Sequence, residues 1–329
     1  MTDKDIYLSI IIPTYNRSKD LLRAISSFCN QKNFDYKYEI IVSDNNSSDN
    51  TKEIVQEYIS NNPLNIIYYH FEPNQGVHYA RNSAAKIASG KILYFTDDDM
   101  EADENLLNEL ISLFQLEPRL GTASGLVLPK FESNPPKWVQ KNLINHYLSL
   151  TEPKIPFHLL ISSDDFGVYS CHQAVRREVF FKAGGFNPEN TKGVWLGDGE
   201  TGLNIKIKSD NWLFGFNRKS IIHHHIPNSR MTLNYILKRM SNQGYSDSYS
   251  EYRKYRNLKK LIYKSLSRNI FAFPRTLLHF IRAIIGQRSF IMLLGRLFYY
   301  HSRNIYDMRI IFNADFRNIV LIDDWLIND

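Results

Sequence analysis

Three consecutive carboxylates follow an apolar run in the first third of the chain. The run is Lys91–Thr96, and it leads directly into Asp97, Asp98 and Asp99. Successive residues of a strand point to opposite faces, so Asp97 and Asp99 are expected to project in the same direction. Like charges gathered at a strand end raise the free energy unless a cation or hydrogen bonds offset them. The triplet predicts a divalent metal site suited to Mg²⁺ or Mn²⁺, or alternatively a solvated turn before a helix N-terminus.

Two further polar segments follow strand-like runs. The first is Pro13-Thr14-Tyr15-Asn16-Arg17, and the second extends from Ser43 to Thr51. Thr and Asn offer hydrogen bonds, Tyr offers a stacking face and Arg suits a phosphate, although a plain strand-to-helix turn also explains the first segment. Asx-turn chemistry explains residues 46–51 but not Asp44, whose carboxylate is able to accept a hydrogen bond from the imide N–H of uracil. Arg81 is a candidate for holding a diphosphate, for pairing with the acidic triplet, or for a surface salt bridge.

The elements that would position these side chains alternate along the first half of the chain. Strand-like runs occupy residues 7–12, 38–43, 65–70 and 91–96, with helical apolar spacing between them. Such alternation predicts an α/β fold with a mostly parallel sheet and helices on both faces. Ligands of these sheets bind at the carboxyl ends of the strands, where the three polar segments are expected to meet.

Composition describes an ordinary globular protein with an uneven charge. The 329 residues are 43% hydrophobic and carry a formal net charge of +6. Residues 230–329 hold 17 Lys and Arg against 7 Asp and Glu, whereas the preceding residues hold 23 against 27. Two cysteines do not make a disulfide framework, and neither a signal peptide nor a spanning helix is predicted. We therefore expect a cytoplasmic protein.

The basic C-terminal region is expected to be mainly helical. A helix is predicted to begin at Arg275 after Pro274. Arg275, Arg282, Arg296 and Arg303 recur at multiples of seven, which is expected to place them close to one helical stripe. One interpretation is peripheral contact of residues 258–303 with an anionic membrane surface at the inner face of the membrane. The other is a helical subdomain that packs on the catalytic body with a solvated basic side.

Several blocks in the same order resemble family 2 glycosyltransferases. The string Ser9–Arg17 resembles the opening of that family, and Asp44–Thr51 resembles its Asp-Asp-Gly-Ser-Thr-Asp-Gly-Thr signature, with Asn45 and Asn46 replacing the second Asp and the Gly. Later blocks also match in order and spacing: Asn74-x-Gly76, Ala80-Arg81-Asn82, Ala88-Ser89-Gly90, Asp97-Asp98-Asp99, Gly184-Gly185-Phe186, Gly197–Leu203 and His224–Thr232. The resemblance covers roughly residues 7–245, and the ensemble is far more specific than any single block.

The resemblance implies a GT-A fold and inverting transfer of a sugar from a nucleotide-sugar, usually a UDP-sugar. It implies a catalytic domain over residues 1–230, with a nucleotide half (1–100) and an acceptor half (101–230), followed by the helical region 231–329. Pro13, Thr14, Tyr15, Arg17 and Asp44 would frame the nucleotide. Arg81 would lie near its phosphates and Asp97 near the ribose and donor sugar. Asp98 would also belong to the binding site of the nucleotide-sugar, and Asp99 would bind the metal.

The same resemblance points to the catalytic base. The family block has Glu-Asp three residues before Leu, and counting back from Leu203 gives Glu200, with Gly199 in place of the preceding Glu. Asp198 is a close competitor, and one of these acids is alternatively a helix cap. By its match, His224 is a candidate to bind the metal or a phosphate, or is a hydrogen-bonded core histidine.

The sequence thus predicts an inverting, metal-dependent glycosyltransferase that builds a surface polysaccharide or a similar glycan. Its expected partners are a nucleotide-sugar donor and a glycan or lipid-linked glycan acceptor, with no nucleic acid. One alternative is a nucleotidyltransferase acting on a sugar phosphate, although Pro13–Arg17 lacks the glycine expected of its loop. The other is a non-catalytic relative that binds a glycan or a partner, which would not need Asp44, Asp97, Asp99 and Glu200 together.

Overall fold

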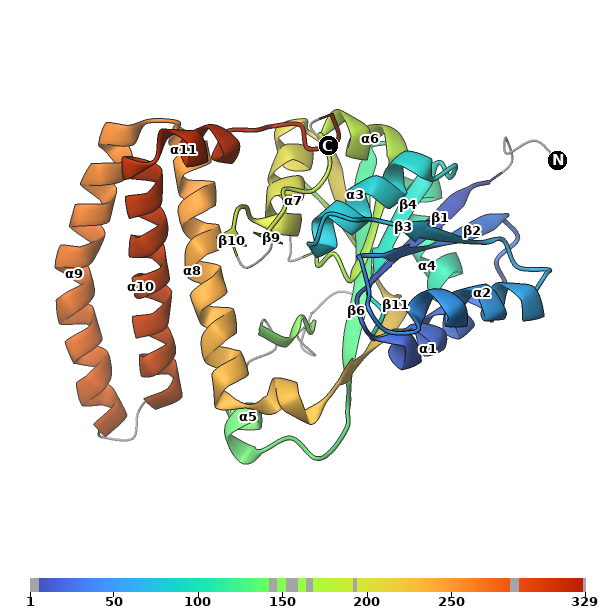
Figure 1. Cartoon of the computed structure of the whole chain (residues 1–329), viewed down its shortest axis with the longest axis horizontal. Coiled ribbons are helices and arrows are strands. Elements are labelled where there is room, and N and C mark those ends of the chain that lie inside the picture. The colour runs from blue at the N-terminus through green and yellow to red at the C-terminus, as the bar shows by residue number, and fades with distance from the viewer. Residues whose placement is uncertain are drawn as a thin grey trace.

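A mixed β-sheet with helices on both faces forms the body of the protein, and three long helices stand beside it (Figure 1). The computed structural model describes residues 6–141, 147–151, 159–163, 168–191, 194–284 and 290–327. Within these residues the main sheet has the order β3-β2-β1-β4-β8-β6-β11-β5, and β7 also pairs with β11. Its strands are β1 (Leu8–Thr14), β2 (Tyr38–Asp44), β3 (Ile67–Phe71), β4 (Ile92–Thr96), β5 (Met100–Ala102), β6 (Leu120–Phe131), β7 (Leu159–Ser162), β8 (His172–Arg176) and β11 (Leu213–Ile226).

The first four strands are parallel, as the sequence predicts. All seven residues of β1 are buried, and the near-continuous apolar run Ser9–Ile12 is what a strand covered on both faces requires. The register pairs Thr14 with Asp44, so the polar segments after β1 and β2 end side by side. The remainder of the sheet is mixed, because β8 is antiparallel to both β4 and β6 while β6 and β11 are parallel.

Helices cover the two faces of the sheet with separate cores. On one face α1 (Ser18–Cys29), α2 (Thr51–Asn61) and α4 (Leu106–Leu116) pack on the strands. On the other face lie α3 (Val77–Ile87), α6 (Arg177–Lys182) and α7 (Gly199–Ser209). The short elements α5 (Lys137–Lys141), β9 (Asn190–Thr191), β10 (Val194–Trp195) and the 3₁₀ helix η3 (Asn228–Met231) complete the body.

The C-terminal region is helical, as expected. It consists of α8 (Leu233–Tyr255), α9 (Leu258–Ile284), α10 (Phe290–Phe312) and α11 (Ala314–Val320), and α10 packs against both α8 and α9. In Figure 1 the chain then returns from α11 to the body, and there Trp325 N–H donates a hydrogen bond to the Gly184 carbonyl at 3.0 Å. In the part of the chain that the structure describes, no helix combines the length and the apolar character that crossing a bilayer requires.

Two details of the predicted helical region are wrong. Pro274 lies inside α9, so no helix begins at Arg275; α9 already starts at Leu258. A proline ring removes one hydrogen bond from a helix, but a helix of this length retains many others. The four arginines at multiples of seven therefore do not form one stripe, because Arg275 and Arg282 belong to α9 while Arg296 and Arg303 belong to α10.

Candidate active site

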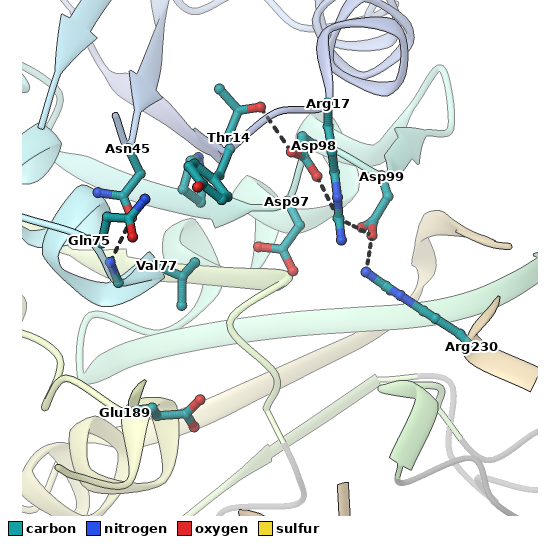
Figure 2. A pocket seen from close by; sticks show the side chains of 13 residues that line it. Thr14, Arg17, Asn45, Gln75, Val77, Asp97, Asp98, Asp99, Glu189 and Arg230 are labelled. Carbon is teal, nitrogen blue, oxygen red and sulfur yellow. Dashed lines mark hydrogen bonds and ion pairs between the residues drawn. The ribbon is translucent and has the colours of Figure 1, made fainter. Parts of the chain in front are cut away.

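A cavity of about 490 Å³ opens at the carboxyl ends of β1 and β4. Its lining combines the segment after β1, the acidic triplet, the start of α3 and two residues from the second half of the chain (Figure 2). The lining residues are Pro13, Thr14, Tyr15, Arg17, Asn45, Gln75, Gly76, Val77, Asp97, Asp98, Asp99, Glu189 and Arg230. The predicted convergence of the first and third polar segments is thus present in the structure.

Three guanidinium groups offset the charge of the triplet. Arg17 Nη1 lies 3.1 Å from Asp98 Oδ1 and 3.0 Å from Asp99 Oδ2, and Arg230 Nη2 lies 2.6 Å from Asp99 Oδ2. Arg81 forms an ion pair with Asp97. Thr14 Oγ1 donates a hydrogen bond to Asp98 Oδ2 at 2.9 Å. The arginines supply the cationic compensation that sequence reasoning assigned to a metal.

The triplet nevertheless keeps one carboxylate oxygen free for a ligand. Among the described residues, Asp99 Oδ1 is buried and has no hydrogen-bond partner. Burial acts to raise the pKa of Asp99, but the nearby His224 together with the charges of Arg230 and Arg17 outweigh it and hold the pKa well below its usual range. An ionised, buried and unpaired oxygen is a fitting ligand for a hard divalent cation. Burial, together with the charge of Asp99, raises the pKa of the adjacent Asp98 to about 7.

His224 lies beside Asp99 but is already hydrogen-bonded on both ring nitrogens. Its Nδ1 lies 2.9 Å from the Leu148 carbonyl oxygen, to which it donates, so Nε2 accepts from Arg230 Nη1 at 2.6 Å. The Nε2 atom lies 3.8 Å from Asp99 Oδ2. The structure therefore contains the hydrogen-bonded histidine that was one of the two expectations, and a metal at Nε2 would have to displace Arg230.

Asp44 is not among the residues that line the first cavity. The carboxylate is buried, and it accepts hydrogen bonds from the Ser47 backbone N–H at 2.9 Å and from the Tyr69 hydroxyl at 2.7 Å. Its neighbour Asn45 does line the cavity. The Asn45 side chain donates to the Asn74 carbonyl at 2.7 Å and accepts from Gly76 N–H at 2.7 Å, which fixes the loop before α3.

A second cavity of about 170 Å³ adjoins the first, and Glu189 lines both. Figure 2 shows Glu189 across the first cavity from Asp97. The second cavity contains Glu200 from the first turn of α7 and four polar side chains from α8, namely Arg239, Asn242, Gln243 and Ser246. Its remaining lining is Tyr147, Ser149, Val168, Tyr169, Trp195, Thr201 and Asn204. The C-terminal region thus contributes a wall of this cavity, beyond the expected boundary at residue 230.

Glu200 lies in a cluster with Glu189 and His78. One ligand atom of each side chain lies within 4.8 Å of the others, and His78 Nε2 is 3.9 Å from Glu189 Oε2. Burial, reinforced by the charge of Glu200, raises the pKa of Glu189 to about 8, whereas burial lowers the pKa of His78 well below its usual value. The two carboxyl groups therefore share a site at which one of them holds a proton near neutral pH.

Gly199 makes this cluster possible. Its φ of +55° belongs to the left-handed region, and a Cβ on it would lie 2.5 Å from both Glu189 Oε1 and His78 Nε2. A side chain at position 199 would push these groups aside. Gly199 stands where the family block has a Glu. In this protein Glu189, from another loop, occupies the space beside it.

Asp198 has a different environment from Glu200. It is buried, and its two oxygens accept hydrogen bonds from Asn187 Nδ2 at 2.8 Å and from Ser250 Oγ at 2.7 Å. It occupies the N-cap position of α7 without a capping bond from its side chain. Ser250 belongs to α8, so Asp198 connects the body to the C-terminal helices.

Sequence reasoning missed Glu189, Arg230 and Arg239 as lining residues. Arg230 stood in the block that begins at His224, so a basic residue at a fixed distance from that histidine was an available signal. Glu189 follows Gly184-Gly185-Phe186 within a few residues, directly before β9. Arg239 had no signal beyond its position on a polar face of α8.

Comparison with known proteins agrees with this geometry. The sequence profile described as "Glycosyl transferase family 2" matches residues 9–182, more than half of the chain. The chain belongs to glycosyl transferase family 2. A family relative in Campylobacter jejuni, a GalNAc(5)-diNAcBac-PP-undecaprenol beta-1,3-glucosyltransferase, is 41% identical over 109 residues, which span 33% of this chain and 33% of that protein.

Solved structures share the fold at low sequence identity. The mannosyltransferase PcManGT from Pyrobaculum calidifontis, in complex with GDP-Man and Mn²⁺, superimposes with a TM-score of 0.60 at 16% identity, covering 92% of this chain and 86% of that chain. GalNAc-T7 with UDP, GalNAc and Mn²⁺ gives a TM-score of 0.52 at 18% identity, covering 76% of this chain and 51% of that chain. These family members and fold neighbours support the GT-A-like architecture, a mixed sheet with flanking helices.

Proposed function

We propose that the protein is an inverting glycosyltransferase that moves a sugar from a UDP-sugar to a hydroxyl of a glycan or lipid-linked glycan. The observation that carries this proposal is the pair of adjoining cavities. One contains the acidic triplet with the free Asp99 Oδ1, the other contains Glu200, and Glu189 lies between them. This arrangement offers a donor site and an acceptor site that share a boundary.

The donor would occupy the first cavity. Tyr15 is 48% exposed there and offers a face for stacking, and Pro13 and Thr14 would border the nucleoside. Arg17 and Arg230 would face the diphosphate, since guanidinium groups match phosphate oxygens. Arg81 would hold Asp97 near the ribose and donor sugar, with Asp98 alongside, and Asp44 would position the uracil pocket from beneath.

The residues present fit a divalent cation. Asp99 would hold it through the free Oδ1, with His224 as a further ligand if Arg230 turned toward the diphosphate. A bound Mn²⁺ or Mg²⁺ would neutralise the negative charge of the diphosphate. The fold neighbours named above were solved with Mn²⁺, which supports the choice of metal.

Glu200 would act as the general base. In the second cavity its carboxylate would accept the proton of the acceptor hydroxyl, whose oxygen would form the new bond to the anomeric carbon. The bond from that carbon to the diphosphate oxygen would break on the opposite side, so UDP leaves and the configuration inverts. Asp198 is less suited, because both of its oxygens are engaged by Asn187 and Ser250.

The acceptor and the cellular location follow the same reasoning. The Campylobacter relative is named for a glycan linked to PP-undecaprenol, which supports a lipid-linked acceptor. Both cysteines are free thiols, which suits a reducing compartment. We infer a cytoplasmic protein that meets its acceptor at the inner face of the membrane during synthesis of a surface glycan, with residues 1–230 as the catalytic unit and α8 completing the acceptor side.

Calorimetric titration of UDP, GDP and CDP, each with and without Mn²⁺, tests this function. We expect metal-dependent binding of UDP that is lost in Asp99→Ala and weakened in Tyr15→Ala. Preferential binding of GDP or CDP would overturn the assignment of the donor. Absence of binding by all three nucleotides would overturn the glycosyltransferase proposal.

A further inference from the structure

The outer surface of α10 carries a continuous apolar stripe. Seven large apolar side chains with exposed fractions of 40–79% lie there, and apart from the adjacent Leu297 and Phe298 they follow one another at intervals of three, four or seven residues. They are Phe290, Leu294, Leu297, Phe298, Ile305, Met308 and Phe312. Residues on the other side of the helix, such as Leu293, Tyr306 and Ile310, are buried, so the stripe faces away from the core.

The neighbouring helix α9 has a similar surface. Its exposed apolar side chains have exposed fractions of 36–72%. They are Ile262, Tyr263, Leu266, Ile270, Phe271, Leu278, Phe280, Ile281 and Ile284. Figure 1 shows α9 and α10 side by side at the end of the molecule farthest from β2 and β3. We call these sixteen side chains the outer apolar surface. Soluble proteins rarely expose so many large apolar groups together without a partner.

The charge of the two helices indicates the kind of partner. Residues 258–312 contain ten Lys and Arg and a single acid, Asp307. Asp307 is buried and paired with Arg268, so no carboxylate of α9 or α10 is exposed among the described residues. Three of these cations form ion pairs within the protein: Lys264, Arg268 and Arg303 each pair with Glu251 of α8. Lys259, Lys260 and Arg309 are exposed.

A second copy of the chain is a poor match for this surface. A two-fold symmetric interface would place the same cations opposite one another without a carboxylate to pair with them. An anionic leaflet supplies the missing negative charge, and its acyl region accepts Phe, Leu and Ile side chains. We propose that the outer apolar surface docks the protein on an anionic membrane, with α9 and α10 lying in the interface rather than crossing it.

The docked orientation would serve the acceptor cavity. α10 packs on α8, and α8 lines the second cavity with Arg239, Asn242, Gln243 and Ser246. The docking surface of α10 is therefore only one helix away from the second cavity, since the axes of packed helices such as α10 and α8 lie about 8–10 Å apart. The link between docking and the acceptor rests on the proposed use of a lipid-linked glycan. The docking surface itself consists of residues that take no part in nucleotide binding.

Vesicle flotation of the full chain tests the proposal. The vesicles are pure phosphatidylcholine, or phosphatidylcholine mixed with phosphatidylglycerol, at low and high salt. We expect binding to the anionic vesicles that weakens in high salt. The double variant Leu297→Glu, Met308→Glu should lower the partition coefficient by about tenfold or more, because two apolar side chains that would enter the leaflet become carboxylates that its negative charge repels.

Matched controls separate docking from misfolding. Leu64→Glu with Leu116→Glu makes the same change of charge at exposed side chains of the catalytic body, and it should bind vesicles like the wild type. The variant Lys259→Glu, Lys260→Glu changes only exposed cations and should also lose affinity for anionic vesicles. UDP titration of every variant reports the folded state of the nucleotide cavity. If the wild type binds vesicles but does not bind UDP, the proposed function is wrong and the docking proposal stands.

Two outcomes would overturn docking. One is a wild type that binds UDP but no vesicles. The other is a dimer, measured by light scattering, that Leu297→Glu, Met308→Glu converts to a monomer without any vesicle binding in the wild type. That second result would assign the outer apolar surface to self-association.

Discussion

At the scale of single residues, Glu200 and Asp198 lie two positions apart but have different surroundings. Glu200 faces the second cavity, where Ser170 Oγ donates a hydrogen bond to it at 3.2 Å. We expect Glu200→Gln to lower the rate of sugar transfer by about 10²-fold or more, as loss of a general base does, with unchanged affinity for UDP. Asp198→Asn should instead lower the free energy of unfolding by about 1–3 kcal/mol, because it disturbs buried hydrogen bonds.

Transfer rates, UDP titration and urea unfolding of both variants distinguish the two roles. The assignment of the base is wrong if Glu200→Gln retains turnover while Asp198→Asn abolishes it at unchanged stability. Thr201→Val is a matched control, because it alters the lining of the same cavity without removing a carboxylate.

A second prediction at this scale concerns the proton on Glu189. Its pKa is raised from 4.5 to about 8, first by burial and then by the charge of Glu200, while Arg239 and Arg81 act in the opposite direction. Between pH 4.5 and about pH 8 the folded protein binds more protons at Glu189 than the unfolded chain does. The contribution of Glu189 to the free energy of unfolding therefore falls as the pH rises through this range. In Glu189→Gln the side chain is neutral at every pH. The free energy of unfolding of the wild type, relative to this variant, should therefore fall from pH 4.5 to 8 and level off above.

Urea unfolding at one-unit steps from pH 5 to pH 9 measures this difference. Glu57→Gln, an exposed carboxylate on α2, is the control and should show no such slope. Equal slopes for the two variants would contradict the raised pKa of Glu189.

At the scale of elements, the first turn of α7 brings this cluster together. Gly199 has a positive φ and leaves space for Glu189 and His78. Gly199→Ala should lower the free energy of unfolding by about 1–2 kcal/mol through backbone strain, and should lower turnover further by displacing Glu189. Asn211→Ala is a matched control, since Asn211 also has a positive φ of 63° but lies outside both cavities. Comparable losses of turnover in the two variants would mean that strain alone explains the effect.

Helix α8 makes a separate contribution through its polar face. Arg239, Asn242, Gln243 and Ser246 recur at helical spacing and line the second cavity. We expect Arg239→Ala to raise the KM for the acceptor about tenfold while UDP affinity stays within twofold, since Arg239 is absent from the first cavity. Lys238→Ala removes an exposed cation from the adjacent position and should change neither value. A loss of UDP affinity in Arg239→Ala would contradict an acceptor-side role.

Elements also explain how much the sequence could predict. The four parallel strands were placed to within about two residues, because each is a short apolar run bounded by polar turns. Thr14, Arg17 and the triplet could be brought together in advance, since parallel strands end at one edge. Glu189 and Arg239 could not, because their positions depend on how a loop and a distant helix pack. The helix start predicted after Pro274 was wrong, because this proline lies inside the long helix α9 and not in its first turn.

At the scale of the whole molecule, the C-terminal helices are attached to the body at several separate places. One lies at Asp198 and Ser250, and another joins Trp195 to Tyr245, whose rings stack at 6.0 Å. The last is the segment after α11, where the Trp325 N–H donates to the Gly184 carbonyl at 3.0 Å and the Asp323 carbonyl accepts from Lys206 of α7 at 3.4 Å. The second cavity is lined by Trp195 together with residues of α8, so its shape depends on how α8 packs on the body.

Substitution of Trp325 tests whether the segment after α11 fixes the position of α8 relative to the body. Its side chain is 5% exposed and meets the Tyr79 ring edge-on at 6.5 Å, while its backbone bonds to Gly184. Trp325→Ala should lower the free energy of unfolding by about 3–5 kcal/mol, as large-to-small changes in a core do. It should also raise the acceptor KM more than it weakens UDP binding, because Tyr79 and Gly184 belong to the body while α8 lines the second cavity but not the first. Ile327→Ala, 78% exposed, should leave both quantities unchanged. Equal losses of donor and acceptor affinity in Trp325→Ala would indicate a general destabilisation, with no special role for this segment in positioning α8.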